Sequence, residues 1–378
     1  MGVAGAASML FIILVSVRAV RLRAVYQVVS WFQVYLRFVM TVSPASNISF
    51  PESCHSTARL LADIGGTNAR FALELGPGRI TAIKVLPCAD YRTLFDALTD
   101  YLSSPAVRAV VGVSIRHAAI AIANPVVDDF VRMTNHHWEF SIKELRCNCG
   151  FETLDVVNDF YALAMSLPHL SEHDKRQVGG GSPCAGAPIG LVGAGTGLGV
   201  SGLVAGRNGW TALRSEGGHV TFSPGSEVEV AILQYAWREF DHVSAERFLS
   251  GAGLELIYRA LAYLKHRRPE GLSAAEISRR ALCGECDMCA EAIDVFCGML
   301  GTVAGNLAIT LGAQGGVYIG GGIVPRLGDH FEQSAFRRRF EQKGRFVNYL
   351  SGVPTYVITT QYPAFVGVSA ILAERLGS

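Results

Sequence analysis

Three glycine-rich turns are the part of this sequence best suited to binding a phosphate. They read DIGGT at residues 63–67, GAGTG at 193–197 and GGG at 320–322. A chain without Cβ atoms can bring several backbone N–H groups close to one anion. Any one of these segments alone could be a plain tight turn. Their occurrence together, with the carboxylate of Asp63 ending the apolar run before the first turn, favours a nucleotide site that includes Mg²⁺, an ion that prefers oxygen ligands.

A second candidate for chemistry is Asp159. It follows an apolar stretch at 154–157 and opens a helical pattern at 160–167. The N-terminus of a helix favours an ionised carboxylate, so we expect Asp159 to be anionic at pH 7 and able to accept a proton. Asp is also a common N-cap residue, and the position by itself leaves both interpretations open.

Two better-known phosphate-binding patterns do not fit the sequence. The Walker string GxxxxGK[ST] is absent. Residues 197–202 (GLGVSG) satisfy GxGxxG, but that dinucleotide fingerprint must open a helix and be followed about 20 residues later by an acid. Here the chain continues as a predicted hairpin through Asn208-Gly209, and Glu216 comes too early. A dehydrogenase is therefore disfavoured.

The segments around these turns predict alternating strands and helices. Apolar runs indicate buried strands, and apolar residues at helical spacing indicate amphipathic helices. Ser141 and Glu144 form the pattern of a capping box. The predicted strands are 60–64, 69–75, 109–114, 118–123, 154–157, 189–192, 200–204, 210–213, 316–319 and 353–358, and the predicted helices are 91–102, 141–145, 160–167, several within 227–312, and 364–376. Each half of the chain opens with strand, glycine turn and strand, so we expect a duplicated α/β fold, with 170–188 as the passage between two domains.

Composition narrows the class of protein. The chain has 378 residues, enough for two domains. Its 33 basic and 32 acidic residues give a net charge of +1, which provides no global field for nucleic acid, so no nucleic-acid partner is expected. Nine cysteines, an odd number in a long chain, indicate free thiols in a reducing compartment. We therefore expect a cytoplasmic protein.

Residues 1–57 differ from the rest of the chain. No acid precedes Glu52, and an apolar run at 3–17 is followed by several arginines. The run is shorter than the roughly 20 residues of a spanning helix, and a signal peptide would carry its charge before the run. The segment stays open as a membrane anchor, a transit segment or a mis-assigned start near Met40. No membrane partner is expected for the remaining chain.

Seven strings in a fixed order resemble the bacterial glucokinase family of the hexokinase and actin-like ATPase superfamily. They are LLADIGGTNARFAL (60–73), MTNHHWEFSI (133–142), VVNDFYALA (156–164), GAGTGLGV (193–200), EGGHVTF (216–222), SAERFLSG (244–251) and GGGIVPR (320–326). The resemblance implies an actin-like (ribonuclease H-like) two-domain sugar kinase fold with a ligand cleft between the domains. The small domain would comprise 58–169 plus 360–378, and the large domain 170–359. The implied protein is a homodimer that phosphorylates D-glucose to glucose 6-phosphate with ATP and Mg²⁺.

The resemblance also implies roles for individual residues. Asp159 would be the catalytic base that accepts the proton of the attacking hydroxyl. Asp63 would reach Mg²⁺ through water. Carboxylates and amides suit a ring of sugar hydroxyls, and the implied sugar-binding residues are Asn158, Asp159, Glu216, His219 and Glu246. The implied ATP-binding residues are Ala62, Asp63, Ile64, Gly65, Gly66, Thr67, Gly195, Thr196, Gly197, Gly320, Gly321 and Gly322.

Other interpretations of the same residues remain open. The alternatives are a non-catalytic sugar- or nucleotide-binding regulator and an actin-like ATPase, but neither needs the acids in the sugar motifs. The zinc motif and N-terminal helix-turn-helix of related repressors do not occur in this sequence. Cysteines 283, 286 and 289, with Cys297 beyond, resemble an iron–sulfur ligand run. The spacing of the fourth is wrong for such a cluster, so we interpret them as small buried residues of a helical region.

Overall fold

The computed structural model describes residues 58–110, 115–207 and 209–377. The predicted N-terminal extension (1–57), most of the predicted strand 109–114 and Asn208 of the predicted hairpin turn lie outside the described residues. All described residues belong to one compact unit. That unit contains two main sheets covered by helices, as the predicted α/β class requires.

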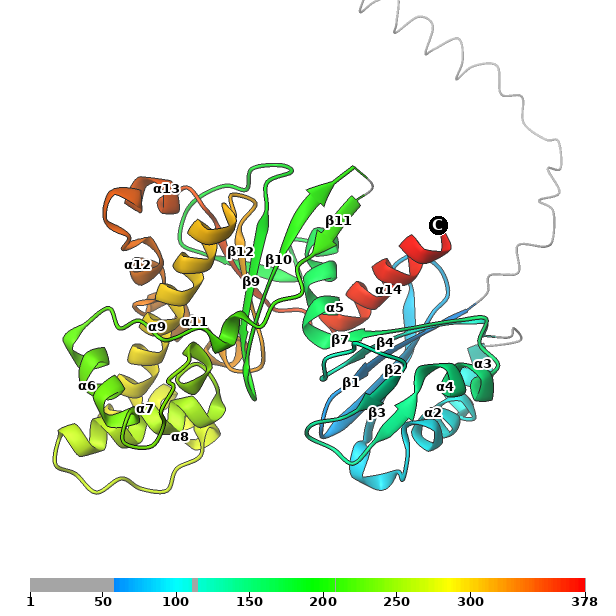
Figure 1. Ribbon diagram of the computed structural model, residues 1–378, viewed down its shortest axis with the longest axis horizontal. Helices are drawn as coiled ribbons and strands as arrows, with labels where there is room; N and C mark the ends of the chain where they lie inside the picture. The colour runs from blue at the N-terminus through cyan, green and yellow to red at the C-terminus, as the bar shows by residue number, and fades with distance from the viewer. Residues whose placement is uncertain (1–57, 111–114, 208, 378) are drawn as a thin grey trace, which may run out of the picture. The chain divides into compact units, whose positions relative to one another are not determined.

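The first sheet has the order β3-β2-β1-β4-β7 (Figure 1). Its strands are β1 (Arg59–Ile64), β2 (Asn68–Glu74), β3 (Ile80–Pro87), β4 (His117–Ile122) and β7 (Thr153–Asn158). Strands β1, β4 and β7 are parallel, and their register places Ile64, Ile122 and Asn158 side by side. The residues that follow these strands therefore meet at one edge of the sheet, which brings the first glycine turn close to Asp159.

Helices cover both faces of the first sheet. They are α2 (Leu94–Leu102), α3 (Pro105–Val110), α4 (Ile142–Cys149) and α14 (Pro363–Leu376), and a small hairpin of β5 (Phe130–Arg132) and β6 (Glu139–Ser141) precedes α4. Alternate side chains of a strand point to opposite faces. Along β1, Leu60 and Ala62 pack in one cluster with residues of α2 and α4, whereas Leu61 packs in another cluster with Phe365 and Val368 of α14.

The second sheet has the order β11-β10-β9-β12-β13-β8. Its strands are β8 (Lys175–Val178), β9 (Ile189–Ala194), β10 (Leu198–Gly206), β11 (Gly209–Ala212), β12 (Val317–Gly320) and β13 (Thr355–Ile358). Strand β12 lies between β9 and β13 and is parallel to both, and its register with β9 pairs Gly320 with Gly193. The second and third glycine turns therefore follow adjacent parallel strands and lie together.

Helix α5 (Asp159–Ser166) packs on one face of the second sheet, and a group of helices packs on the other. That group comprises α6 (Glu227–Ala236), α7 (Gly251–Leu264), α8 (Ala274–Leu282), α9 (Asp287–Leu311), α10 (Val324–Leu327), α11 (Asp329–Gln333), α12 (Phe336–Glu341) and α13 (Val347–Ser351). Helix α5 also lies beside α14 (Figure 1). The helix that begins with Asp159 therefore contacts the second sheet directly and, through α14, is connected to the first.

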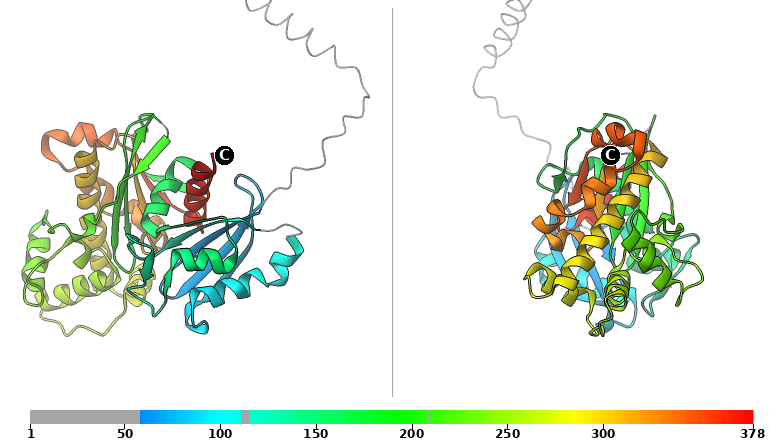
Figure 2. Two further views of the ribbon diagram at one scale, coloured as in Figure 1. Left: turned by 45° about the vertical axis from the view of Figure 1, so that its right-hand side comes forward. Right: turned by 90° about the vertical axis from the view of Figure 1, so that its left-hand side faces the viewer.

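Helix α9 runs through the middle of this helical group, in contact with α7, α8 and α12 (Figure 2). Among the described residues it is the one helix long and apolar enough to cross a membrane. Of its most apolar window, 61% is buried inside the protein, which is the pattern of a core helix.

Most predicted elements are confirmed to within a few residues, one prediction is wrong, and several strands were not predicted. The passage 170–188 contains β8, an edge strand whose polar sequence KRQV hides the period-two signal. Residues 109 and 110 end helix α3 instead of starting a strand. Strand β3 was not predicted, because half-exposed positions interrupt its apolar pattern. The predicted β10–β11 hairpin is confirmed, so the GxGxxG match lies in a turn and strand that do not open a helix.

Candidate active site

Asp63 lies at the end of β1 and is paired with a cation on the next strand. The β1–β2 register places Asp63 opposite Arg70, and the Arg70 Nη1 donates to Asp63 Oδ2 at 2.9 Å. Burial raises the pKa of Asp63, and the Arg70 charge opposes that shift. The turn that follows is held by backbone bonds, from the Gly65 amide to the Asn68 carbonyl at 3.0 Å and from the Cys88 amide to the Thr67 carbonyl at 2.8 Å. The first glycine turn is thus fixed by strands on both sides.

Asn158, the last residue of β7, is the N-cap of α5. Its Oδ1 accepts from the amides of Phe160 at 3.0 Å and Tyr161 at 3.1 Å, which satisfies two of the unpaired N–H groups of the first turn. Asp159 is therefore the first helical residue and not the cap. The N-cap interpretation of Asp159 is wrong, and the Asp159 carboxylate has one oxygen free for other partners.

Asp159 lies in a buried and negatively charged environment. Burial and then the nearby charge of Asp63 raise the pKa of Asp159 to about 6. Hydrogen bonds to Asp159 Oδ1 from the Phe160 amide at 2.8 Å and from Asn158 Nδ2 at 3.1 Å act in the opposite direction. The carboxylate is mostly ionised at pH 7, as expected. The expected cause was incomplete, because burial and Asp63 outweigh the stabilisation by the helix N-terminus.

The second and third glycine turns are interlocked. Gly321 has a φ of +81°, a left-handed conformation that side chains rarely adopt. A Cβ on Gly321 would also collide with the backbone of Ala194. The Ile323 amide donates to the Ala194 carbonyl at 3.3 Å, and the Gly195 amide donates to the Gly197 carbonyl at 2.8 Å. Glycine is required here because two backbones approach closely at the carboxyl ends of adjacent strands.

Phe160 connects α5 to the second glycine turn. A Cβ on Gly193 would lie 2.9 Å from the Phe160 ring, and a Cβ on Gly199 would collide with the same ring. The two glycines therefore leave the space into which Phe160 packs. Since Phe160 follows Asp159 directly, this contact fixes the carboxylate relative to the turn at 195–197.

Glu246 lies beside the same turn. It belongs to the short 3-10 helix η4 (Ala245–Arg247), and its Oε2 accepts from the Leu198 amide at 2.8 Å. A Cβ on Gly197 would collide with this carboxylate. Glu246 Oε1 is 4.0 Å from Nδ1 of His219, which ends the 3-10 helix η3 (Gly217–His219) and is exposed. The structure thus brings Glu246 and His219 together at the second glycine turn.

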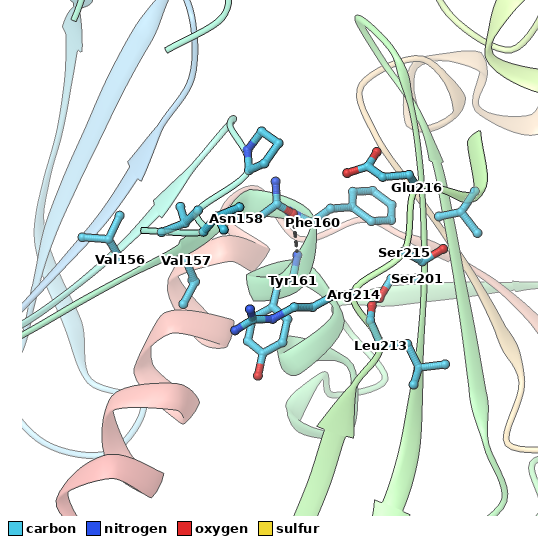
Figure 3. Close-up of a pocket in the computed structure, with 14 residues that line it drawn as sticks. Val156, Val157, Asn158, Phe160, Tyr161, Ser201, Leu213, Arg214, Ser215 and Glu216 are labelled. Carbon is cyan, nitrogen blue, oxygen red and sulfur yellow. Dashed lines mark hydrogen bonds between the residues drawn. The ribbon is translucent and has the colours of Figure 1, made fainter. Parts of the chain in front are cut away.

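A cavity of about 240 Å³ is lined by two of the predicted sugar-binding residues, Asn158 and Glu216. Figure 3 shows them on opposite sides of the cavity, with Phe160 and Tyr161 of α5 between them. The Arg214 guanidinium lies 5.8 Å from the centre of the Tyr161 ring at another part of the wall. The other residues of the wall are Pro125, Val126, Val127, Val156, Val157, Val200, Ser201, Leu213 and Ser215. Asp159, His219 and Glu246 do not line this cavity.

Sequence reasoning missed two residues that support this site. Arg70 pairs with Asp63, and a cross-strand register from the β1–β2 hairpin could have identified it. Asn124 Oδ1 accepts from the Thr134 amide at 3.0 Å and hydroxyl at 2.8 Å, and the Asn124 carbonyl accepts from Asn158 Nδ2 at 3.4 Å.

Asn135 then contacts the first glycine turn. A Cβ on Gly66 would lie 3.2 Å from the Asn135 Cβ. Together, Asn124 and the segment 133–138 connect the cap of α5 to the first glycine turn. No local sequence pattern predicts this connection, because its residues come from separate loops.

The four cysteines singled out above are only partly buried. Cys289 and Cys297 are buried in α9, as predicted, but Cys286 is half-buried and Cys283 is exposed at the end of α8. Within the described residues, no group of three or more His, Cys, Asp or Glu side chains is placed to hold a metal ion.

Comparison with known proteins identifies relatives over most of the chain. A family model described as Glucokinase matches residues 60–375. "Bifunctional protein glk" of Paraburkholderia xenovorans is 58% identical over 85% of this chain and 49% of its own length. The chain therefore spans about half the length of that relative. A protein named Glucokinase from Chromobacterium violaceum is 55% identical over 84% of this chain and 90% of its own length.

A solved structure gives the same answer for the fold. The crystal structure of glucokinase from an Antarctic psychrotroph is 35% identical, with a TM-score of 0.76 over 84% of this chain and 98% of the other. The expected two-domain sugar kinase architecture is thereby confirmed.

Proposed function

Because the chain belongs to the glucokinase family, we propose that it transfers the γ-phosphoryl group of ATP to the 6-hydroxyl of D-glucose. The observation that supports this most directly is the position of Asp159. Its carboxylate has a pKa of about 6 and lies next to Asp63, where the first glycine turn begins. A proton acceptor beside a phosphate-binding turn is what phosphoryl transfer to a hydroxyl requires.

In this proposal Asp159 acts as the general base. Its free oxygen accepts the proton of the 6-hydroxyl as the O6–P bond forms and the bond from Pγ to the bridging oxygen of ADP breaks. A pKa near 6 keeps the carboxylate ionised at pH 7 while leaving it basic enough to take a proton. Asn158 supports this role because it caps α5 and so leaves Asp159 available.

The nucleotide is proposed to lie against the three glycine turns. Backbone amides of residues 62–67 and of Gly195, Thr196 and Gly197 would bind the phosphates, and residues 320–322 would contact the adenosine. The support is the arrangement of the turns: the second and third follow adjacent parallel strands, and the position of a Cβ on Gly322 has no atom within 4 Å, which leaves the third turn open to a ligand.

Asp63 is the residue proposed to face Mg²⁺, through water. A carboxylate oxygen is the donor type that this ion prefers, and the cation would favour the charged form of Asp63, which burial disfavours. The bound ion would neutralise charge on the phosphates of ATP.

The sugar is proposed to bind between α5 and the strands β10 and β11. Asn158 and Glu216 would contact it from opposite sides of the cavity, and His219 and Glu246 from the second glycine turn. Each would satisfy sugar hydroxyls, so a hexose that lacks one would leave a buried polar group unpaired and be rejected.

The test is a coupled assay with ATP and Mg²⁺ over a panel of hexoses, with direct detection of the phosphorylated sugar. We expect glucose 6-phosphate as the product, and strong loss of turnover with 2-, 3- and 4-deoxyglucose. ATP hydrolysis without sugar phosphorylation would instead support an actin-like ATPase, and sugar binding without turnover would support a regulator.

The remaining predictions about the whole protein are also proposals. We propose a cytoplasmic homodimer, with 58–169 plus 360–378 as the small domain and 170–359 as the large one. Sedimentation of the full chain tests the dimer. Limited proteolysis tests the boundaries, with cleavage expected near residues 170 and 360.

A further inference from the structure

The CxxC string of Cys286 and Cys289 has no role in the proposed kinase reaction. Cys286 is the N-cap of α9, and its side chain accepts no capping hydrogen bond. Cys289 lies one turn later and is fully buried in the core of the helical group. The two thiols lie close enough to interact, and both are free.

Cys286 lies at the N-terminus of a long helix. The first amides of a helix have no intrahelical partner, and the dipole of a helix stabilises a negative charge at its N-terminus. In CxxC motifs this arrangement makes the first cysteine reactive. α9 has 25 residues, so the dipole is fully developed.

Cys289 differs from Cys286 in its burial. Burial, followed by the hydrogen bond with Cys286, raises the pKa of Cys289 to about 12. It is therefore a protonated thiol that no bulky reagent can reach. The pair thus consists of one accessible thiol at a helix N-terminus and one buried thiol directly behind it.

The turn before α9 keeps this arrangement in place. Gly284, with a φ of +68°, reverses the chain after α8, and the Glu285 amide donates to the Arg280 carbonyl at 2.9 Å. Arg279 pairs with Glu285 at 2.7 Å. Cys283 belongs to the end of α8 and is exposed, so it is on the other side of the turn from the pair.

From this geometry we propose that Cys286 and Cys289 form a reversible intramolecular disulfide when the protein meets hydrogen peroxide. The Cys286 thiolate attacks one peroxide oxygen, the O–O bond breaks, and hydroxide leaves as water after taking a proton. The sulfur of Cys289 then attacks the sulfenic acid of Cys286, forming the S–S bond and releasing a second water. Two thiols are oxidised as one peroxide is reduced to two waters, and a dithiol reductant reverses the change.

The site is independent of the kinase assignment, and so is its test. Reduced full-length protein is treated with hydrogen peroxide under native conditions, free thiols are alkylated in denaturant, and disulfide thiols are then reduced and labelled with a second reagent. Tandem mass spectrometry locates both labels. We expect the second label on Cys286 and Cys289, a mass loss of about 2 Da before reduction, and only the first label on Cys283 and Cys297.

Variants separate the roles of the two thiols. In C289S, the sulfenic acid of Cys286 should persist and be trapped by dimedone. In C286S, Cys289 should remain a free thiol. C283S is the matched control and should form the disulfide as the wild type does. Since C289S changes a core residue and could fold poorly, the wild-type label map decides the matter on its own.

Two results would overturn the proposal. One is a disulfide that includes Cys283 or Cys297 in place of either partner. The other is a Cys286 that reacts no faster with peroxide than the exposed Cys147 or Cys184. We expect at least about a ten-fold difference, because the unpaired amides at the start of α9 stabilise negative charge on the attacking sulfur.

Discussion

Asn158 and Asp159 are adjacent residues at the start of one helix, and the Asn158 carboxamide both caps α5 and donates to Asp159 Oδ1. The cap therefore uses the amide and leaves the acid available for proton transfer. Exchange of the two residue types would keep a cap but place the acid where its oxygen is occupied by backbone amides.

Replacement of Asp159 by Ala should abolish phosphorylation and leave ATP binding nearly intact. The glycine turns that we assign to ATP do not depend on this side chain. Product formation and fluorescent nucleotide binding are measured on the same preparation. Turnover close to that of the wild type would remove Asp159 as the base.

The pH profile should report the same carboxylate. Since burial and Asp63 raise the pKa of Asp159 to about 6, kcat/KM should be half-maximal near pH 6 and fall about ten-fold per unit below it. The activity should be flat between pH 7 and 8. A direct assay of glucose 6-phosphate avoids the pH dependence of a coupling enzyme, and full activity at pH 5 would contradict the assignment.

The ionised Asp159 carboxylate should lower the free energy of unfolding at neutral pH. Its folded-state pKa is above that of the unfolded chain, so the protonated form is stabilised by folding and this contribution is lost as pH rises through about 6. Asp159→Asn should therefore be more thermostable than the wild type at pH 8, and the difference should shrink toward pH 4. Thermal unfolding at both pH values measures it. Glu291→Gln, at an exposed ion pair with Lys265, is the control and should show little change.

The packing of Phe160 against Gly199 can be tested by a substitution that fills the space of the ring. Gly199→Ala places a methyl group where the Phe160 ring lies, and overpacking of this kind costs about 1–3 kcal/mol. Activity should fall as well, because Asp159 moves with its neighbour. Phe160→Leu in the same chain should restore part of the stability. Gly76→Ala, where a Cβ has open space, is the matched control.

Asn124 should act on catalysis through the residues it connects. Asn124→Ala removes the acceptor of the Thr134 amide and hydroxyl. Two lost hydrogen bonds of about 1 kcal/mol each would lower kcat/KM by roughly ten-fold or more if the segment 133–138 moves away from Gly66. Asn124→Asp keeps the acceptor and should retain most activity. Asn148→Ala, on the exposed end of α4, should be neutral, and equal effects of the three variants would refute the role.

The sequence predicted the glycine turns, the strands before them and Asp159 because each has a local signature. An apolar run, a glycine cluster and a helical pattern all lie within about a dozen residues of chain. The same locality explains the successful prediction of the β10–β11 hairpin around Gly209.

The features that the sequence left undetermined depend on contacts between distant segments. Gly193 and Gly199 look like flexible positions until Phe160 is seen to fill the space above them. The pKa of Asp159 depends on burial and on Asp63, which precedes it by nearly a hundred residues, so a helix-terminus argument could give its charge state but not its shift. Strand β8 is polar because it is an edge strand, and no periodicity reveals it.

Helix α14 determines when the core of the first sheet can be completed during synthesis. Phe365, Val368 and Leu372 complete the core on one face of the first sheet, yet they follow every strand of the second sheet in the chain. During synthesis, the apolar face of strands β1 and β4 therefore stays uncovered until the second sheet has left the ribosome. The first sheet to be made is therefore the last whose core is completed.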